Sequence, residues 1–98
     1  MTVEIILDGR NLTDRASVHD FFATALQLPD YYGRNLDALY DLLSTWPERV
    51  AIKVIYPDSM VENLGKYANA LLKTLQDAAE SNPKIIFINS CEKTENNT

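Results

Sequence analysis

Hydrophobic residues recur along this chain with helical spacing in three places. Between residues 18 and 26 they occupy positions i, i+3, i+4, i+7 and i+8, which predicts an amphipathic helix. Either Thr13 or Asp14 can cap its start. The same spacing predicts a helix from Asn35 to Ser44 and a longer one from about Lys66 to Ser81.

Three short apolar runs rich in β-branched residues predict strands at Val3–Leu7, Val50–Tyr56 and Ile85–Ile88. Apolar residues on both faces are typical of a buried parallel sheet with helices packed against it. The order strand-helix-helix-strand-helix-strand therefore predicts an α/β fold: a three-stranded parallel sheet packed against helices, with right-handed crossovers. Residues 60–64 fit one further helical turn.

The length and composition of the chain fit one small globular domain. The chain has 98 residues, of which 46% are hydrophobic, and it shows no internal repeat and no linker. We assign residues 1–91 to a single domain. Residues 92–98 are polar, and we expect them to form a disordered C-terminal tail.

The net charge of −5 bears on the class of partner. It disfavours nucleic acid, because phosphate binding requires a basic surface. A basic protein is compatible, since opposite charge would accelerate its approach. The chain has no apolar run of the roughly 20 residues that span a bilayer and no signal-peptide pattern, and its one cysteine is Cys91. We therefore expect a cytoplasmic protein without membrane contact, monomeric when free.

Candidate catalytic residues are few. His19 is the one histidine, and beside Phe21 and Phe22 a structural or solvent-facing role is more common than catalysis. Cys91 has no base near it in the sequence and has the character of a small buried apolar residue. The three glycines do not form a phosphate-binding loop. We predict no enzyme, no cofactor and no metal site.

The helix that Asn35 can cap carries two acids. Asp37 and Asp41 are four residues apart, so both carboxylates leave the helix on one face. A like-charge pair at this spacing costs roughly 0.2–0.5 kcal/mol. A solvated surface is one explanation for it, and a basic partner is another.

Large aromatic residues flank these acids in the sequence, and they favour a basic partner as the explanation for the acidic pair. Tyr31, Tyr32, Tyr40 and Trp46 lie close to the acids in the sequence. Tyrosine and tryptophan are enriched at the energetic centres of protein interfaces. Some of these rings must also pack into the core of so small a domain.

The run LPDYYGRNLDALYD, from Leu28 to Asp41, resembles the signature of the barstar family, the bacterial intracellular inhibitors of small secreted ribonucleases. The similarity extends from the first strand to about Asn89 and is strongest between Leu28 and Trp46. The resemblance implies the barstar fold. It also implies that an acidic helix face plugs the active site of a basic, barnase-type ribonuclease.

The resemblance also implies roles for individual residues. Asp41 takes the place of the chief acidic anchor, and Asp37 that of a second acid on the same face. Tyr31 matches the ring that packs over the catalytic histidine of the nuclease, whereas Tyr32 supports the turn. Asp77 lies where the family often carries a glutamate. The full partner-binding set that we expect is Tyr31, Asn35, Asp37, Tyr40, Asp41, Thr45, Trp46, Glu48 and Asp77.

Some residues of this set depart from the family's pattern. Tyr40, Thr45 and the Trp46–Pro47 bond differ from the family's best-known member, which changes the rim of the site and leaves its acidic centre. Arg34 adds a positive charge beside the acids, which would reject some partners.

Two alternatives remain open at this point. The first is a barstar-like interaction module of the antitoxin or immunity type, for another basic partner. The second is a small-molecule or metal-binding domain in which Asp37 and Asp41 would bind a cation.

Overall fold

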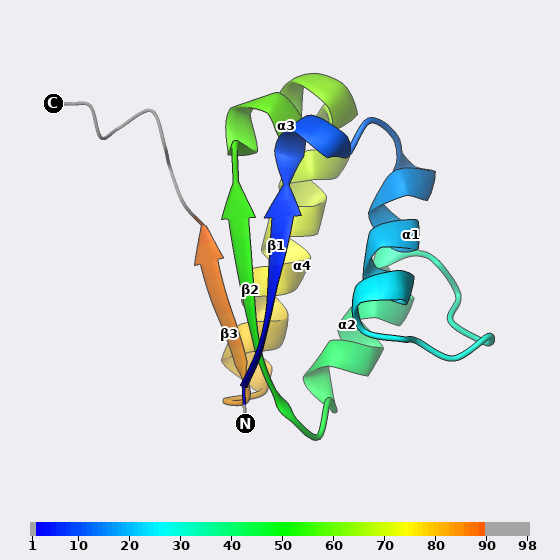
Figure 1. Cartoon of the computed structure of the whole chain (residues 1–98), viewed down its shortest axis with the longest axis vertical. Coiled ribbons are helices and arrows are strands. Elements are labelled where there is room, and N and C mark those ends of the chain that lie inside the picture. Colours follow the sequence, from blue (N-terminus) through cyan, green and yellow to red (C-terminus); the bar gives the residue numbers. More distant parts are fainter. Residues whose placement is uncertain (1, 90–98) are drawn as a thin grey trace, which may run out of the picture.

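The computed structural model describes residues 2–89, so the expected tail and Cys91 lie outside the described residues. The three strands and the three main helices follow one another in the predicted order, and two shorter helices stand between them (Figure 1). They are, in chain order, β1 (Thr2–Asp8), the short 3-10 helix η1 (Gly9–Asn11), α1 (Arg15–Ala25), α2 (Leu36–Ser44), β2 (Arg49–Ile55), α3 (Pro57–Leu64), α4 (Lys66–Ser81) and β3 (Ile85–Asn89).

The strands form one three-stranded sheet in the order β1-β2-β3, and both pairings are parallel. This confirms the α/β fold with a parallel sheet. The register places Val50 between Val3 and Ile85, and it places Ile52 between Ile5 and Phe87. These residues share one face of the sheet, because side chains alternate between faces along a strand.

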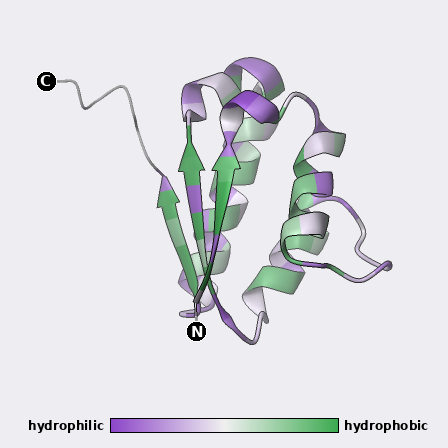
Figure 2. Cartoon of the chain, in the orientation of Figure 1, coloured by the Kyte–Doolittle hydropathy of each residue, from purple (hydrophilic) through white to green (hydrophobic). Residues whose placement is uncertain are grey.

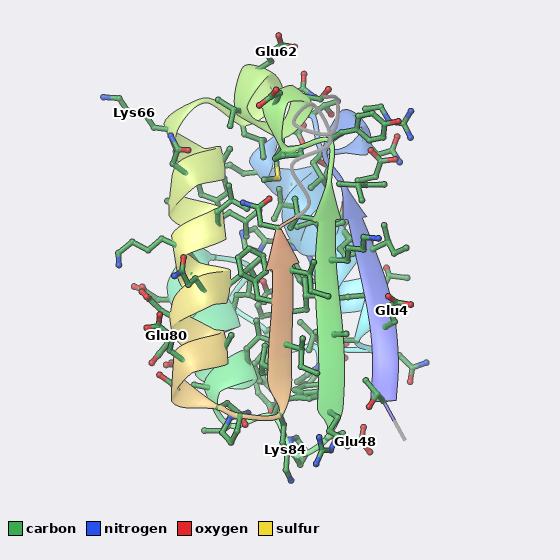
Figure 3. The ribbon with its side chains drawn as sticks, turned by 90° about the vertical axis from the view of Figure 1, so that its left-hand side faces the viewer. Glu4, Glu48, Glu62, Lys66, Glu80 and Lys84 are labelled. Atoms are coloured by element: carbon green, nitrogen blue, oxygen red, sulfur yellow. The ribbon has the colours of Figure 1, made fainter. Side chains whose placement is uncertain are left out.

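The opposite face of the sheet is open, and here the expectation of a sheet buried on both faces is wrong. Ile6, Ile86 and Ile88 are 48%, 41% and 43% exposed. In Figure 3, Glu4 projects from β1 on the side away from α4. The strand order gives the reason. Crossovers are almost always right-handed, and in the order β1-β2-β3 two crossovers of one hand carry their helices to the same face.

The core lies between the covered face of the sheet and the helices, and Figure 2 shows hydrophobic residues along both. Each main helix contributes its apolar stripe. The fully buried hydrophobic residues of these helices include Val18 and Phe22 of α1, Leu39 and Leu43 of α2, and Leu71 and Leu75 of α4. Asp14 caps α1 in a capping box with Ser17, so Asp14 and not Thr13 begins this helix.

Helix α3 is longer than expected. It begins at Pro57 and has eight residues, whereas the pattern predicted one turn over 60–64. Proline ends a strand, but its fixed φ and missing N–H also suit the first position of a helix. Gly9 lies under this helix, where a Cβ would meet the Tyr56 carbonyl oxygen at 2.1 Å, so no larger residue fits. Across residues 2–89, no helix has the length and apolar character to cross a membrane.

Candidate functional site

The loop before α2 exposes one of its two tyrosines and buries the other. Tyr31 is 83% exposed, whereas Tyr32 is 6% exposed and belongs to the core. The backbone N–H of Tyr32 donates to the Pro29 carbonyl oxygen at 3.0 Å, which closes a turn. The structural role expected of Tyr32 is thereby confirmed, and Tyr31 is available to a partner.

Helix α2 starts as predicted. The Asn35 side-chain oxygen accepts a hydrogen bond from the Ala38 N–H at 2.8 Å, so Asn35 is the N-cap. Its Nδ2 donates to the Gly33 carbonyl oxygen at 3.2 Å. The preceding residue, Arg34, has a φ of 57°, in the left-handed region that favours glycine. The cap and the turn thus fix the direction in which α2 leaves the loop.

Helices α2 and α4 together form a surface hollow that we call the acidic groove. Its lining residues are Leu36, Asp37, Tyr40 and Asp41 of α2, and Thr74 and Asp77 of α4. The groove therefore brings together three of the acids predicted from the sequence, although Asp77 lies far from the others in the chain. Asp77 makes one exposed ion pair, with Lys73 on its own helix at 3.4 Å. Such pairs are weak, so this carboxylate can exchange partners at little cost.

The side chains around the acids are held by hydrogen bonds. The Tyr40 hydroxyl is 2.7 Å from the Ser81 Oγ, which ties the ring to the end of α4. Thr45 Oγ1 donates to the Asp41 carbonyl oxygen at 3.0 Å, as Ser44 Oγ does at 3.1 Å. Thr45 therefore helps to close the last turn of α2.

Not all of the expected binding residues meet at the groove. Trp46 and Glu48 line a different hollow. The other residues of that hollow are Val3, Ala25, Leu26, Gln27 and Val50. The Trp46 ring is half-buried and packs against the core, because the chain turns after α2 toward β2.

Asn82 supports the loop after α2, a role that the sequence pattern did not indicate. Its Nδ2 donates to the carbonyl oxygens of Leu43 and Trp46 at 2.9 and 3.0 Å, and its Oδ1 accepts from the Lys84 N–H at 3.0 Å. Asn82 is 8% exposed. The available signal was a polar residue before Pro83, at the end of a long amphipathic helix.

His19 links the loop before α2 to two helices. Its Nδ1 is 2.5 Å from the Tyr32 hydroxyl, and its Nε2 is 2.6 Å from the Tyr67 hydroxyl. Burial lowers the pKa of His19, and the nearby Arg34 lowers it further. Burial also raises the pKa of Tyr32 to about 12 and that of Tyr67 above its usual value. His19 is thus a neutral core residue at neutral pH, which confirms the structural role and excludes the solvent-facing one.

Cation binding by Asp37 and Asp41 was the second alternative that the sequence left open. Among residues 2–89, no group of three or more histidine, cysteine, aspartate or glutamate side chains is arranged to hold a metal ion.

Comparison with known proteins shows which family the chain belongs to. Residues 2–90 match the family model described as "Barstar (barnase inhibitor)". The chain is also 39% identical, over 79 residues, to a Bacillus subtilis (strain 168) protein named "Putative ribonuclease inhibitor YrdF". That match covers 79% of this chain and 86% of the relative. Members of the matched family are inhibitors and not enzymes. The chain, with its parallel sheet and its helix pair, belongs to the barstar family.

Proposed function

We propose that this chain inhibits a small, basic, barnase-type ribonuclease by covering its active site with the acidic groove. The observation that carries the proposal is the convergence of Asp37, Asp41 and Asp77 on one hollow between two packed helices. Family membership and the named relative support a ribonuclease inhibitor. We base the proposed mechanism of inhibition on the carboxylates of the acidic groove.

A ribonuclease must hold RNA phosphates with cationic side chains. Carboxylates placed at the phosphate positions would pair with the same cations and exclude the substrate. Asp37 and Asp41 leave one face of α2, and its buried Leu39 and Leu43 anchor this helix in the core. Because the acids are already in place, binding would cost little conformational entropy. Inhibition then requires occupancy of the active site and no chemical step.

Tyr31 is the second part of the proposed interface with the nuclease. Its ring is exposed while its neighbour Tyr32 is buried, so the loop presents it at almost no folding cost. A tyrosine ring offers apolar area and a polarised face to a cation or an imidazole. We propose that Tyr31 packs over the catalytic histidine of the nuclease. In the cytoplasm, an inhibitor of this kind would protect the RNA of the cell that makes the nuclease.

The direct test is titration of the purified chain into barnase acting on an RNA substrate. We expect cleavage to stop at one inhibitor per nuclease. Asp41→Asn and Asp37→Asn should relieve the inhibition. Glu62→Gln is the matched control, because Glu62 projects from α3 away from α4 and does not line the groove (Figure 3). Full cleavage at excess wild-type chain, or equal inhibition by all the variants, would overturn the proposal.

A further inference from the structure

We infer that Arg15 and Arg34 form a second binding site, which takes a carboxylate side chain that the ribonuclease presents beside its basic active site. This inference rests on the proposed function and names a further feature of the partner. We call the site the basic hollow. Its lining residues are Arg15, Arg34, Asn35, Leu36, Asp37 and Tyr67.

The basic hollow adjoins the acidic groove. The two share Leu36 and Asp37, in the first turn of α2. The face that would meet the nuclease therefore changes character within a short distance, from a groove with three carboxylates to a hollow with two guanidinium groups and the shared Asp37. A partner that is basic throughout would match only one of the two hollows.

Arg34 occupies a position that does not suit an arginine. Its φ of 57° is a left-handed conformation, which costs a residue with a Cβ roughly 1–2 kcal/mol. Its guanidinium donates to the Asp20 carboxylate of α1, but both side chains are largely exposed, at 47% and 68%. An exposed pair of this kind contributes about 0–1 kcal/mol, which does not explain the choice of arginine here. Contact with a partner would explain it.

Arg15 reaches the same hollow from α1. Its guanidinium carbon lies 4.6 Å from the centroid of the Tyr67 ring, in a cation–π contact. The Tyr67 hydroxyl is itself bonded to buried His19, so the ring that supports Arg15 is fixed. In the part of the chain that the structure describes, Arg15 makes no salt bridge. Its donors are therefore held in place for an external acceptor.

A carboxylate is the acceptor that this arrangement favours. The guanidinium group has a planar fork of N–H donors that matches the two oxygens of a carboxylate. A nuclease with an aspartate or glutamate next to its cationic site would satisfy both hollows in one orientation only. A nuclease with a cation at that place would be repelled by Arg15 and Arg34.

The test uses three variants that each remove one positive charge from a chain of net charge −5: Arg34→Asn, Arg15→Gln and Lys66→Gln. Asparagine tolerates the left-handed conformation, so Arg34→Asn should fold normally. Lys66 is the control, because it projects from the start of α4 and does not line the hollow (Figure 3). Dissociation constants for barnase should rise roughly twofold to fivefold for each arginine variant and stay unchanged for Lys66→Gln.

The direction of the change is decisive. If the partner surface opposite the hollow is basic, loss of either arginine will tighten binding, and the carboxylate site is overturned. Barnase variants with single acids replaced by amides complete a double-mutant cycle, in which one acid should couple to Arg34. If the effect of every acid replacement in barnase simply adds to that of Arg34→Asn, the carboxylate site is also overturned. Asp41→Ala, measured in the same series, separates the carboxylate site from the proposed function. If Asp41→Ala does not weaken binding, the result counts against the acidic groove itself.

Discussion

At the scale of single residues, Tyr31 and Tyr32 show how adjacent identical side chains acquire different roles. Tyr31 is 83% exposed and Tyr32 is 6% exposed. The Tyr32 hydroxyl is also bonded to His19, which ties this ring to α1. The turn closed between Pro29 and Tyr32 directs one ring inward and the other outward.

We predict that substitutions at these two positions separate affinity from stability. Tyr31→Ala should weaken binding to barnase and leave the melting temperature nearly unchanged. Tyr32→Phe should lower the free energy of unfolding by about 1–3 kcal/mol, because it leaves His19 Nδ1 without its partner. Tyr32→Ala should cost roughly 3–5 kcal/mol, the range for a buried ring. Thermal melts and binding titrations measure both properties, and exchanged roles would refute the assignment.

The second prediction at this scale concerns Asp41. We expect Asp41→Ala to weaken nuclease binding by about 2–5 kcal/mol, more than any other single truncation, because cations of the partner would be left buried and unpaired. Folding should not suffer, since the substitution removes a like-charge pair with Asp37. Calorimetric titration of the variant against wild type gives the difference, and equal affinities would rule out a central role for Asp41.

At the scale of elements, α2 is a nine-residue helix whose two ends are secured differently. Asn35 caps its start through a contact three residues away, with Ala38. The last turn of α2 is held by Asn82, which follows α4 and lies 39 residues beyond Leu43. The Asn82 side chain donates a hydrogen bond to the Leu43 carbonyl oxygen. Short helices are only marginally stable in isolation. These contacts and the buried leucines therefore hold the acids in position.

Asn82 should therefore matter to both stability and binding. We predict that Asn82→Ala lowers the free energy of unfolding by about 1–3 kcal/mol, since it leaves the buried carbonyl oxygens of Leu43 and Trp46 without a donor. Asn69→Ala, at an exposed position of α4, is the control and should be neutral or slightly stabilising. Urea unfolding compares the two variants, and an equal effect from both would exclude this role for Asn82.

At the scale of the whole molecule, buried His19 makes stability depend on pH. Burial lowers its pKa in the folded state below the value of about 6.5 for an exposed imidazole. Arg34 lowers this pKa and Asp20 raises it, and the two contacting hydroxyls belong to Tyr32 and Tyr67. Between the folded and unfolded pKa values the unfolded chain binds more protons, so stability rises with pH there.

We predict that the free energy of unfolding is highest above about pH 6.5 and falls as the pH drops from there toward the folded-state pKa. The slope in this window should not exceed about 1.4 kcal/mol per pH unit, which is the limit for one proton. His19→Gln should flatten the curve below about pH 6.5 while retaining a side chain that can donate and accept. Urea unfolding at a series of pH values checks this, and the same slope in both proteins would remove His19 as the cause.

The charge of the whole chain should govern the speed of complex formation. With a net charge of −5 and acids clustered in one groove, association with a basic nuclease should slow as salt is added. The Debye length falls from about 10 Å at 0.1 M salt to about 3 Å at 1 M. Stopped-flow rates across this range measure the effect, and a flat profile would argue against electrostatic steering.

The sequence by itself determined the features that depend on near neighbours in the chain. The spacing of leucines and the Asn35 cap specify α2, and the same spacing places Asp37 and Asp41 on one face. The apolar runs specify three strands, and their order with the helices specifies a parallel sheet. Each of these features follows from hydrogen bonds or side-chain periods that repeat within a few residues.

Only the tertiary structure decided what depends on distant contacts. It brought Asp77, which only the family resemblance had added to the site, into one hollow with the acids of α2. It directed Trp46 to a different hollow and gave His19 two tyrosine partners. It also left one sheet face open, because the handedness of the crossovers carries the helices to one side. Local periodicity carries no information about which helix faces pack together, since that depends on how the whole core is filled.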